Sequence, residues 1–362
     1  MAKLPPSFAD AMPEIPDLPA ALRLLVEQIP PGRVATYGQL AEALGSSHAA
    51  KWVASWLIEE PPTARCPTHR VVRADGSLGD YRARSAADQA ALLEADGIAV
   101  VSGKVDLSRH AVEKFQSNAP LQSLADWQTT VAEQVSLVLP AAIRDQLNGN
   151  GNIAGDELGH LVGGVDVSYT TSTRAVAAYV LVDINTGELV WSATHEQEVR
   201  FPYISGFLAL REIPIILPLL ETVKSAGKLA PILFVDGHGT LHRRKMGIAS
   251  HLGIVTGLST IGVGKTLSLG QVDMEEVEPG ETRPIIHDGQ VVGTALRPFT
   301  SKKPLYFSPG HRMDLATATD LVCRLNQAHR LPDPTYWADR LSRAAARLLQ
   351  SAESNEKNSS EL

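Results

Sequence analysis

Three β-rich runs in the middle of the chain constrain its fold more than any other feature. They read LVGGVDVSY, AVAAYVLVDI and LVWSATHEQEV, and Asn185-Thr186-Gly187 predicts the turn between the last two. Helical and strand patterns alternate after them, with a helix predicted over residues 210–227 and a buried strand over 230–236 that leads into a glycine-containing loop. A strand meander followed by alternating units predicts a mixed α/β sheet flanked by helices.

Three acids fall where such a sheet would bury them. Asp166 lies inside an apolar strand, Asp236 ends another, and Glu212 opens the helix between them. A charge in a buried strand costs several kcal/mol unless it is paired or binds a metal. Carboxylates that converge there would bind a hard cation, Mg²⁺ or Mn²⁺ rather than Zn²⁺. The alternative is that each acid caps an element or forms a salt bridge, because sequence spacing alone does not bring the three together.

Five motifs resemble the endonuclease V family in order and in spacing, over roughly residues 120–346: VGGVDVSY, RFPYISGFLALRE, FVDGHGTLHRRKMGIASHLGI, TIGVGKTL and KPLYFSPGHRMDL. The resemblance implies a ribonuclease-H-like fold and metal-dependent cutting of DNA near deaminated bases, chiefly hypoxanthine. Family members cut the second phosphodiester 3′ to deoxyinosine and leave 3′-hydroxyl and 5′-phosphate ends.

The same resemblance implies roles for individual residues. Asp166, Glu212 and Asp236 would bind Mg²⁺, for which Mn²⁺ would substitute. His311 would help to position a metal-bound water or a second ion, and Lys265 would lie close to the reacting phosphate.

Recognition of the damaged base would fall to two loops. Tyr203 matches the family's wedge, an aromatic ring that fills the gap left by a flipped base. Gly237 and His238 fall in the loop that lines the base pocket. Ser205 stands where family members often have proline, so the wedge loop is expected to be less rigid here.

The first hundred residues resemble a second family. Residues 37–45 and 46–60 predict two short helices joined by a turn, the pattern of a helix-turn-helix. The motifs IPPGRVATYGQLAEALG, HAAKWVASWL and PTHRVVRADGSLGDY are similar to the DNA-binding domain of O6-alkylguanine-DNA alkyltransferases. This resemblance implies a mainly α, winged helix-turn-helix domain.

The alkyltransferase nucleophile would stand at Thr68, where a hydroxyl replaces the thiol. A threonine hydroxyl is a poor alkyl acceptor. Cys66 lies two residues earlier, about 7 Å along an extended chain, and is expected to be a buried thiol. The similarity is therefore to alkyltransferase-like proteins, which also replace this cysteine and bind lesions without repairing them.

DNA contacts of this domain follow from the same resemblance. Tyr37 matches the tyrosine that presses on the target nucleotide's phosphate, and Lys51 stands where the family has an arginine that inserts into the base stack. Lysine stacks poorly compared with a guanidinium. The Pro-Thr-His-Arg sequence of residues 67–70 is called the pocket motif below. Further DNA-binding candidates in and around it are Arg65, Thr68, His69 and Arg70.

The domains are expected at residues 20–100 and 126–346, with a linker over 101–125 and a polar, disordered tail over 347–362. The net charge of −7 is a mild argument against nucleic acid as a partner. No apolar run is long enough to span a membrane, and the two cysteines form no disulfide framework, which favours a cytoplasmic protein.

The chain is thus interpreted as a DNA-repair endonuclease acting at deoxyinosine, fused to a non-catalytic domain that binds alkylguanine lesions. Two alternatives stay open. The first is an endoribonuclease for inosine-containing RNA that uses the same residues. The second is a lesion sensor without enzymatic activity.

Overall fold

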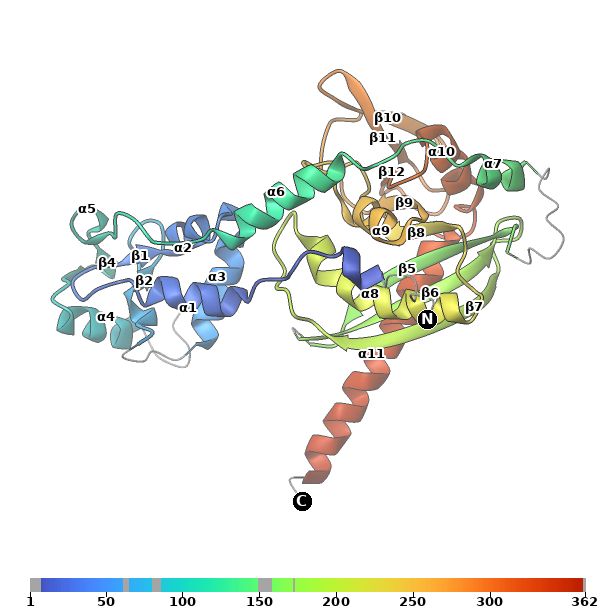
Figure 1. The fold of residues 1–362 in the computed structure, drawn as a ribbon. Coiled ribbons are helices and arrows are strands. Elements are labelled where there is room, and N and C mark those ends of the chain that lie inside the picture. Colours follow the sequence, from blue (N-terminus) through green and yellow to red (C-terminus); the bar gives the residue numbers. More distant parts are fainter. Residues whose placement is uncertain (1–7, 61–64, 80–85, 149–157, 172, 361–362) are drawn as a thin grey trace, which may run out of the picture. The chain divides into compact units, whose positions relative to one another are not determined.

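The computed structural model describes residues 8–60, 65–79, 86–148, 158–171 and 173–360. The chain divides into two compact units (Figure 1). One, here called the helical unit, comprises Pro13–Trp127 and Phe201–Phe207. The other, here called the sheet unit, comprises Met1–Met12, Gln128–Arg200 and Leu208–Leu362.

The helical unit contains short helices and two small sheets. Its elements are α1 (Leu18–Val26), β1 (Ala35–Thr36), α2 (Tyr37–Ala43), η2 (Ser47–Ala49), α3 (Ala50–Glu59), η3 (Thr68–Arg70), β2 (Val71–Val72), α4 (Ala86–Ala95), β3 (Val100–Val101), β4 (Lys104–Val105) and α5 (Leu107–His110). Strands β1 and β2 pair in parallel, and β3 and β4 pair antiparallel. The helix α6 (Pro120–Ala132) contains the division between the units.

The predicted helix at residues 37–45 is confirmed as α2, and its start follows from side-chain chemistry. The Thr36 hydroxyl accepts from the backbone of Gln39 at 3.1 Å, while the Gln39 side chain accepts from the backbone of Thr36 at 2.9 Å. This reciprocal capping box satisfies two otherwise orphaned donors. The second predicted helix begins later than expected, because Ser46 makes no side-chain cap and a single 3₁₀ turn, η2, precedes α3.

The predicted mixed sheet is confirmed in the sheet unit, where eight strands run in the order β10-β11-β12-β9-β8-β5-β6-β7. Their bounds are β5 (Leu161–Tyr169), β6 (Arg174–Asp183), β7 (Leu189–Glu198), β8 (Ile232–Asp236), β9 (Ser259–Gly264), β10 (Thr282–His287), β11 (Gln290–Leu296) and β12 (Leu305–Pro309). Strands β5, β8 and β9 are parallel, and the remaining pairs are antiparallel.

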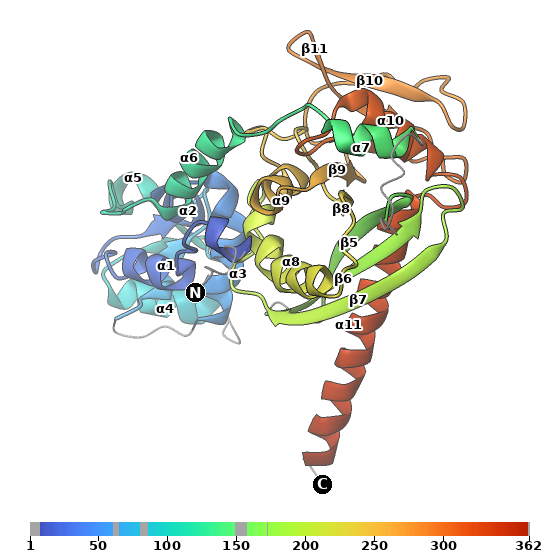
Figure 2. The ribbon, with the colours of Figure 1, turned by 45° about the vertical axis from the view of Figure 1, so that its right-hand side comes forward.

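Helices cover both faces of this sheet (Figure 2). The helices of the unit are η1 (Phe8–Ala11), α7 (Ala141–Leu147), α8 (Leu208–Ser225), α9 (Ile248–Thr256), α10 (Leu315–Arg324) and α11 (Asp333–Ser360). Buried residues of α8 and α9 form one core with alternate residues of the strands, such as Val165. Residues of α10 and α11 form another core with the opposite set, such as Val162. Alternation along the central strands β5, β6 and β8 thus supplies both apolar faces.

The last helix differs from the sequence-based expectation. Helix α11 continues to Ser360, through most of the segment for which polar composition predicts disorder. Residues 343–349, RAAARLL, are strong helix formers and continue directly from the packed part of the helix. Residues 101–110, expected to begin a linker, contain β4 and α5, and Val105 packs in the core of the helical unit. Within the described part of the chain, no helix combines the length and apolarity that a membrane span requires.

Candidate functional site

Three carboxylates from separate elements meet in the sheet unit. Asp166 lies in β5, Asp236 is the last residue of β8, and Asp339 lies in α11. One oxygen of each lies within 4.8 Å of the others. Strands β5 and β8 are parallel neighbours in register at Val165 and Val235, so the next residue of each strand is an aspartate at the same level. Helix α11 packs against both strands and adds the third.

Two cations hold this carboxylate group together. Lys265 follows β9 directly, and its Nζ lies 2.5 Å from Oδ2 of Asp236 and 3.2 Å from Oδ1 of Asp339. Arg343, one turn along α11, lies 2.8 Å from the same oxygen of Asp339. These ion pairs reduce the repulsion between the carboxylates and place Lys265 at the centre of the site.

A buried serine orients the first carboxylate. The hydroxyl of Ser342 is fully buried and donates to Oδ2 of Asp166 at 2.5 Å. The hydroxyl of Ser168 lies 2.8 Å from that of Ser342. Because the Ser342 proton is directed to Asp166, Ser168 is the donor in that second bond. The pair fixes which oxygen of Asp166 remains available.

Burial makes the carboxylate group a site of unfavourable negative charge. Desolvation, together with the neighbouring charge of Asp236, raises the pKa of Asp166 to about 7. A bound cation would relieve this cost, since it favours the ionised form. Closely spaced carboxylate oxygens are the donors that hard divalent cations prefer. The donor set therefore fits a divalent metal.

Glu212 lies beside the carboxylate group without joining it. Its side chain is buried on α8 and accepts a hydrogen bond of 2.9 Å from the hydroxyl of Tyr169. Burial raises the pKa of Glu212 to about 8, and the charges of Asp166 and Asp236 contribute in the same direction. The structure thus brings two of the three expected ligands together, and direct metal binding by Glu212 stays a prediction.

Asp339 is not among the site residues expected from the sequence. A signal for a further helix exists. Asp333-Pro334 places proline at a helix start, and apolar residues follow at helical spacing. What the sequence lacks is any sign that this helix packs across β5.

His311 lies outside the carboxylate group. Its Nδ1 accepts from the backbone of Ser136 at 3.3 Å, and its own backbone donates to the hydroxyl of Thr260 at 2.9 Å. These bonds anchor the loop that follows β12. The predicted role of His311 toward metal or water stays a prediction.

The loop after β8 is tightly packed. Gly237 has a φ of +138°, and a Cβ there would lie 2.4 Å from Cγ2 of Ile248, so only glycine fits. Nε2 of His238 lies 3.0 Å from the carbonyl oxygen of Thr266. Burial lowers the pKa of His238, which favours a neutral ring that donates through Nε2. The loop is therefore fixed next to Asp236.

Tyr203 presents its ring to solvent. It is 64% exposed, on a segment whose flanking rings, Phe201 and Phe207, are buried with their centroids 6.4 Å apart. An exposed tyrosine between two buried aromatic anchors is a prominent side chain on a fixed loop. Its use as a wedge stays a prediction.

The pocket motif of the helical unit contains a buried hydroxyl and a buried thiol. Thr68 is buried in η3, and its Oγ1 has no hydrogen-bond partner among the described residues. Cys66 is buried as well, as expected. Burial, and secondarily the carboxylate of Glu60, raises the pKa of the Cys66 thiol to about 11. Neither group is an activated nucleophile.

The neighbouring residues of this motif form an ion-pair network. Arg70 binds Asp96 through Nε at 2.6 Å and Nη2 at 2.9 Å, and Nε2 of His69 lies 2.9 Å from the same carboxylate. A third bond joins Nη1 of Arg70 to the carbonyl of Ile29 at 2.7 Å. All three nitrogens of the Arg70 guanidinium therefore already have partners within the protein, and few of its N–H groups remain for a phosphate.

The other DNA-binding candidates of the helical unit differ in exposure. Lys51, on α3, and Arg65 are exposed, as phosphate contacts would be. Tyr37 is half-buried at the start of α2, and a Cβ on Gly79 would lie 2.1 Å from its hydroxyl oxygen. Glycine at position 79 therefore leaves room for the Tyr37 hydroxyl.

Comparison with known proteins assigns a family to each part. A family model of endonuclease V matches residues 143–340, and one of the DNA-binding domain of 6-O-methylguanine DNA methyltransferase matches residues 20–98. The endonuclease V of Nostoc punctiforme is 37% identical over 225 residues, which cover 60% of this chain and 96% of that protein.

Solved structures agree with the first assignment. The catalytic domain of human endonuclease V is 34% identical with a TM-score of 0.56, over 64% of this chain and 98% of that one. An endonuclease V of Ciona intestinalis, solved with a 23mer DNA containing an inosine followed by a ribo-adenosine, is 25% identical with a TM-score of 0.54, over 65% of this chain and 100% of that one. The carboxylate group, Lys265 and Glu212 all lie within the matched residues 143–340. The chain belongs to the endonuclease V family, and an alkyltransferase-type DNA-binding domain precedes its nuclease part.

Proposed function

We propose that this protein is a divalent-metal-dependent endonuclease that nicks DNA at the second phosphodiester 3′ to deoxyinosine. We further propose that its helical unit binds lesion-containing DNA, including O6-alkylguanine DNA, without transferring the alkyl group. The observation that carries the first proposal is the group of Asp166, Asp236 and Asp339 beside Lys265, in a chain of the endonuclease V family.

These residues have complementary tasks in phosphodiester hydrolysis. Asp166, Asp236 and Asp339 would hold the metal, with Mg²⁺ as the proposed ion and Mn²⁺ as a substitute. A divalent ion bound there neutralises charge on the phosphate and lowers the pKa of a coordinated water. Lys265, which pairs with Asp236 and Asp339, would lie close to the reacting phosphate and donate to it. Glu212, which accepts a hydrogen bond from Tyr169, would offer the metal a further oxygen ligand from α8.

Substrate recognition rests on the two loops identified above. Tyr203 fills the gap in the base stack after the damaged base flips out. Gly237 and His238 line the pocket that receives the base.

RNA is the second candidate substrate, and one observation favours it. The nucleic acid bound to the Ciona intestinalis relative contains a ribo-adenosine directly after the inosine. A nuclease that accepts a ribose at that position could cut inosine-containing RNA with the same residues.

The helical unit is proposed as a winged helix-turn-helix, with α2 and α3 as the helix pair and the β3–β4 hairpin as the wing. Thr68 in place of a nucleophile and the raised pKa of Cys66 support binding without alkyl transfer, because the thiolate is the reactive species. Incubation with O6-methylguanine DNA should leave the protein mass unchanged, and a methylated Cys66 would contradict this.

One experiment tests the nuclease proposal. End-labelled duplexes that carry inosine, uracil, O6-methylguanine or an abasic site, and an inosine-containing RNA, are incubated with Mg²⁺ and with EDTA. We expect the inosine duplex to be nicked in the presence of Mg²⁺ and not in the presence of EDTA. Faster cutting of the RNA would favour the second candidate, and absence of cutting on every substrate would leave a lesion sensor.

A further inference from the structure

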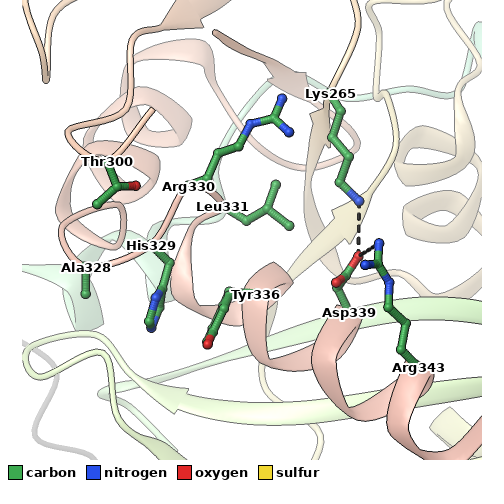
Figure 3. Close-up of a pocket in the computed structure, with 9 residues that line it drawn as sticks. All are labelled: Lys265, Thr300, Ala328, His329, Arg330, Leu331, Tyr336, Asp339 and Arg343. Carbon is green, nitrogen blue, oxygen red and sulfur yellow. Dashed lines mark hydrogen bonds and ion pairs between the residues drawn. The ribbon is translucent and has the colours of Figure 1, made fainter. Parts of the chain in front are cut away.

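A pocket of about 460 Å³ adjoins the carboxylate group and shares Lys265 and Asp339 with it (Figure 3). Most of its lining comes from the loop before α11 and from the first turns of that helix. The lining residues beyond the shared pair are Thr300, Ala328, His329, Arg330, Leu331, Tyr336 and Arg343.

Among the described residues, Arg330 is a cation of this pocket for which no ion pair is seen. Lys265 and Arg343 both pair with Asp339, as the dashed lines of Figure 3 mark. Nε of Arg330 is buried and has no hydrogen-bond partner among the described residues. A buried donor on a charged group is costly to leave unsatisfied. This position therefore calls for an acceptor, preferably an anion.

The backbone around Arg330 is fixed in place. Nδ2 of the buried Asn326 donates to the carbonyl of His329 at 3.1 Å and to that of Arg330 at 2.9 Å. The side chain of Leu331 is buried in the sheet-unit core. A fixed backbone and a buried Nε limit the positions that the guanidinium can take, which reduces the entropy lost when a ligand binds.

Two aromatic side chains of the pocket lining are also held in place. The rings of His329 and Tyr336 stack with centroids 3.5 Å apart and planes 14° from parallel. The Tyr336 hydroxyl accepts a bond of 3.0 Å from Nη1 of Arg340. The pocket is thus a formed cavity with aromatic, hydroxyl and guanidinium groups, the mixture that suits a sugar-phosphate unit.

We propose that this pocket binds the phosphate next to the one that is cut, with Arg330 as its ligand. The inference rests on the proposed nuclease function. A strand that places one phosphate at the carboxylate group has to continue past it, and the pocket shares a wall with that group. Arginine binds phosphate oxygens through two parallel bonds, which fixes position as well as charge.

The test compares two variants of the full chain on a single-stranded DNA with one inosine. R330Q removes the Arg330 guanidinium. R324Q removes an equal charge from an exposed ion pair on α10, outside the pocket, and serves as the control. Loss of a charged hydrogen bond to phosphate should raise the KM of R330Q roughly 10- to 100-fold with kcat little changed. The slope of log kcat/KM against log salt should flatten by about 0.7 for one phosphate contact.

A methylphosphonate scan of the same DNA tests the contact without altering the protein. In the wild-type protein, neutralising the phosphate next to the cut should raise KM by a similar factor. R330Q should show no further loss at that position, because the two changes remove the same contact. This second arm also decides the matter if R330Q is unfolded, as judged by its thermal transition.

The outcomes separate this inference from the proposed function. Cutting of inosine DNA with equal KM and salt slope in R330Q and R324Q, or with equal KM at every methylphosphonate position, would overturn the phosphate site and leave the nuclease intact. If the wild-type protein cuts no inosine substrate, the nuclease proposal fails and the phosphate site fails with it.

Discussion

At the residue scale, the nuclease part holds three carboxylates close together although their negative charges repel one another. Asp166, Asp236 and Asp339 lie within 4.8 Å of one another, and Lys265 stands among them. A protein folds this way at a cost in stability, since buried like charges destabilise the ionised form. Such a cost is characteristic of sites built for a ligand or a reaction rather than for stability.

Asp339 is predicted to be as important as the two strand aspartates. D339A should reduce the nicking rate by at least about 100-fold, because a lost ligand removes several kcal/mol of transition-state stabilisation. The matched control is D320A, which removes an exposed carboxylate from α10. Nicking rates and Mn²⁺ binding by electron paramagnetic resonance check this. Wild-type rate and affinity in D339A would show that the metal site lies elsewhere.

Tyr203 is predicted to matter only when a base has to leave a stack. Y203A should slow the cutting of inosine duplex by about tenfold and affect single strands little, since stacking on an aromatic ring contributes roughly 1–3 kcal/mol. The ring is 64% exposed, so stability should not change. Rates on paired and unpaired substrates give the measurement, and an equal loss on both would contradict the wedge.

At the scale of elements, the strand and helix patterns of residues 161–236 predicted β5 to β8 and the helix α8. The pairing of β5 with β8, which the sequence patterns do not specify, brings Asp166 and Asp236 to one place, because parallel neighbours put equivalent residues side by side. Asp339 could not be predicted as a site residue, because the sequence of α11 does not indicate which strand this helix packs against. The hydrogen bond from Tyr169 to Glu212 is a tertiary contact of the same kind.

Element η3 and the end of α4 are joined by a network that depends on pH. Burial lowers the pKa of His69, and the hydrogen bond from Arg70 lowers that of Asp96. In both cases the unfolded chain binds more protons, so stability rises with pH. The contribution of His69 is present above its unfolded pKa, about 6.5, and is lost as the pH falls toward the folded value. The contribution of Asp96 is lost at still lower pH.

The helical unit should therefore unfold at a temperature several degrees lower at pH 5 than at pH 7.5. H69Q, which keeps a neutral donor beside Asp96, should flatten this dependence. H48Q changes an exposed histidine of the same unit and should not. The fluorescence of Trp52 and Trp56 on α3 reports the transition. A pH dependence unchanged in H69Q would assign it to other groups.

At the scale of the whole molecule, two DNA-directed parts share one chain. Residues 20–98 and 143–340 match separate families. Tethering makes a second DNA contact intramolecular, at an effective concentration of about millimolar for a short linker. A helical unit that only adds phosphate contacts would tighten binding to any DNA, and salt would erase the gain.

A helical unit that recognises alkylated guanine should instead tighten binding to alkylguanine DNA selectively. In the full-length protein, Y37A should weaken binding to an O6-methylguanine duplex by about tenfold, the loss of one charge-assisted contact, and leave inosine nicking unchanged. K51A serves as a comparison, because it removes an exposed charge of the same unit. Binding is measured at two salt concentrations. Equal losses on unmodified, inosine and alkylguanine duplexes would reduce the unit to a DNA clamp.

A carboxylate group that serves as the nuclease site should cut at one defined bond beside inosine, and mapping that bond is the decisive experiment. A duplex with one inosine, labelled at either end, is incubated with Mg²⁺ and the wild-type protein or D166A. We expect a single nick at the second phosphodiester 3′ to the inosine, with 3′-hydroxyl and 5′-phosphate ends, and no product with D166A. A nick at another bond, or undiminished nicking by D166A, would contradict it.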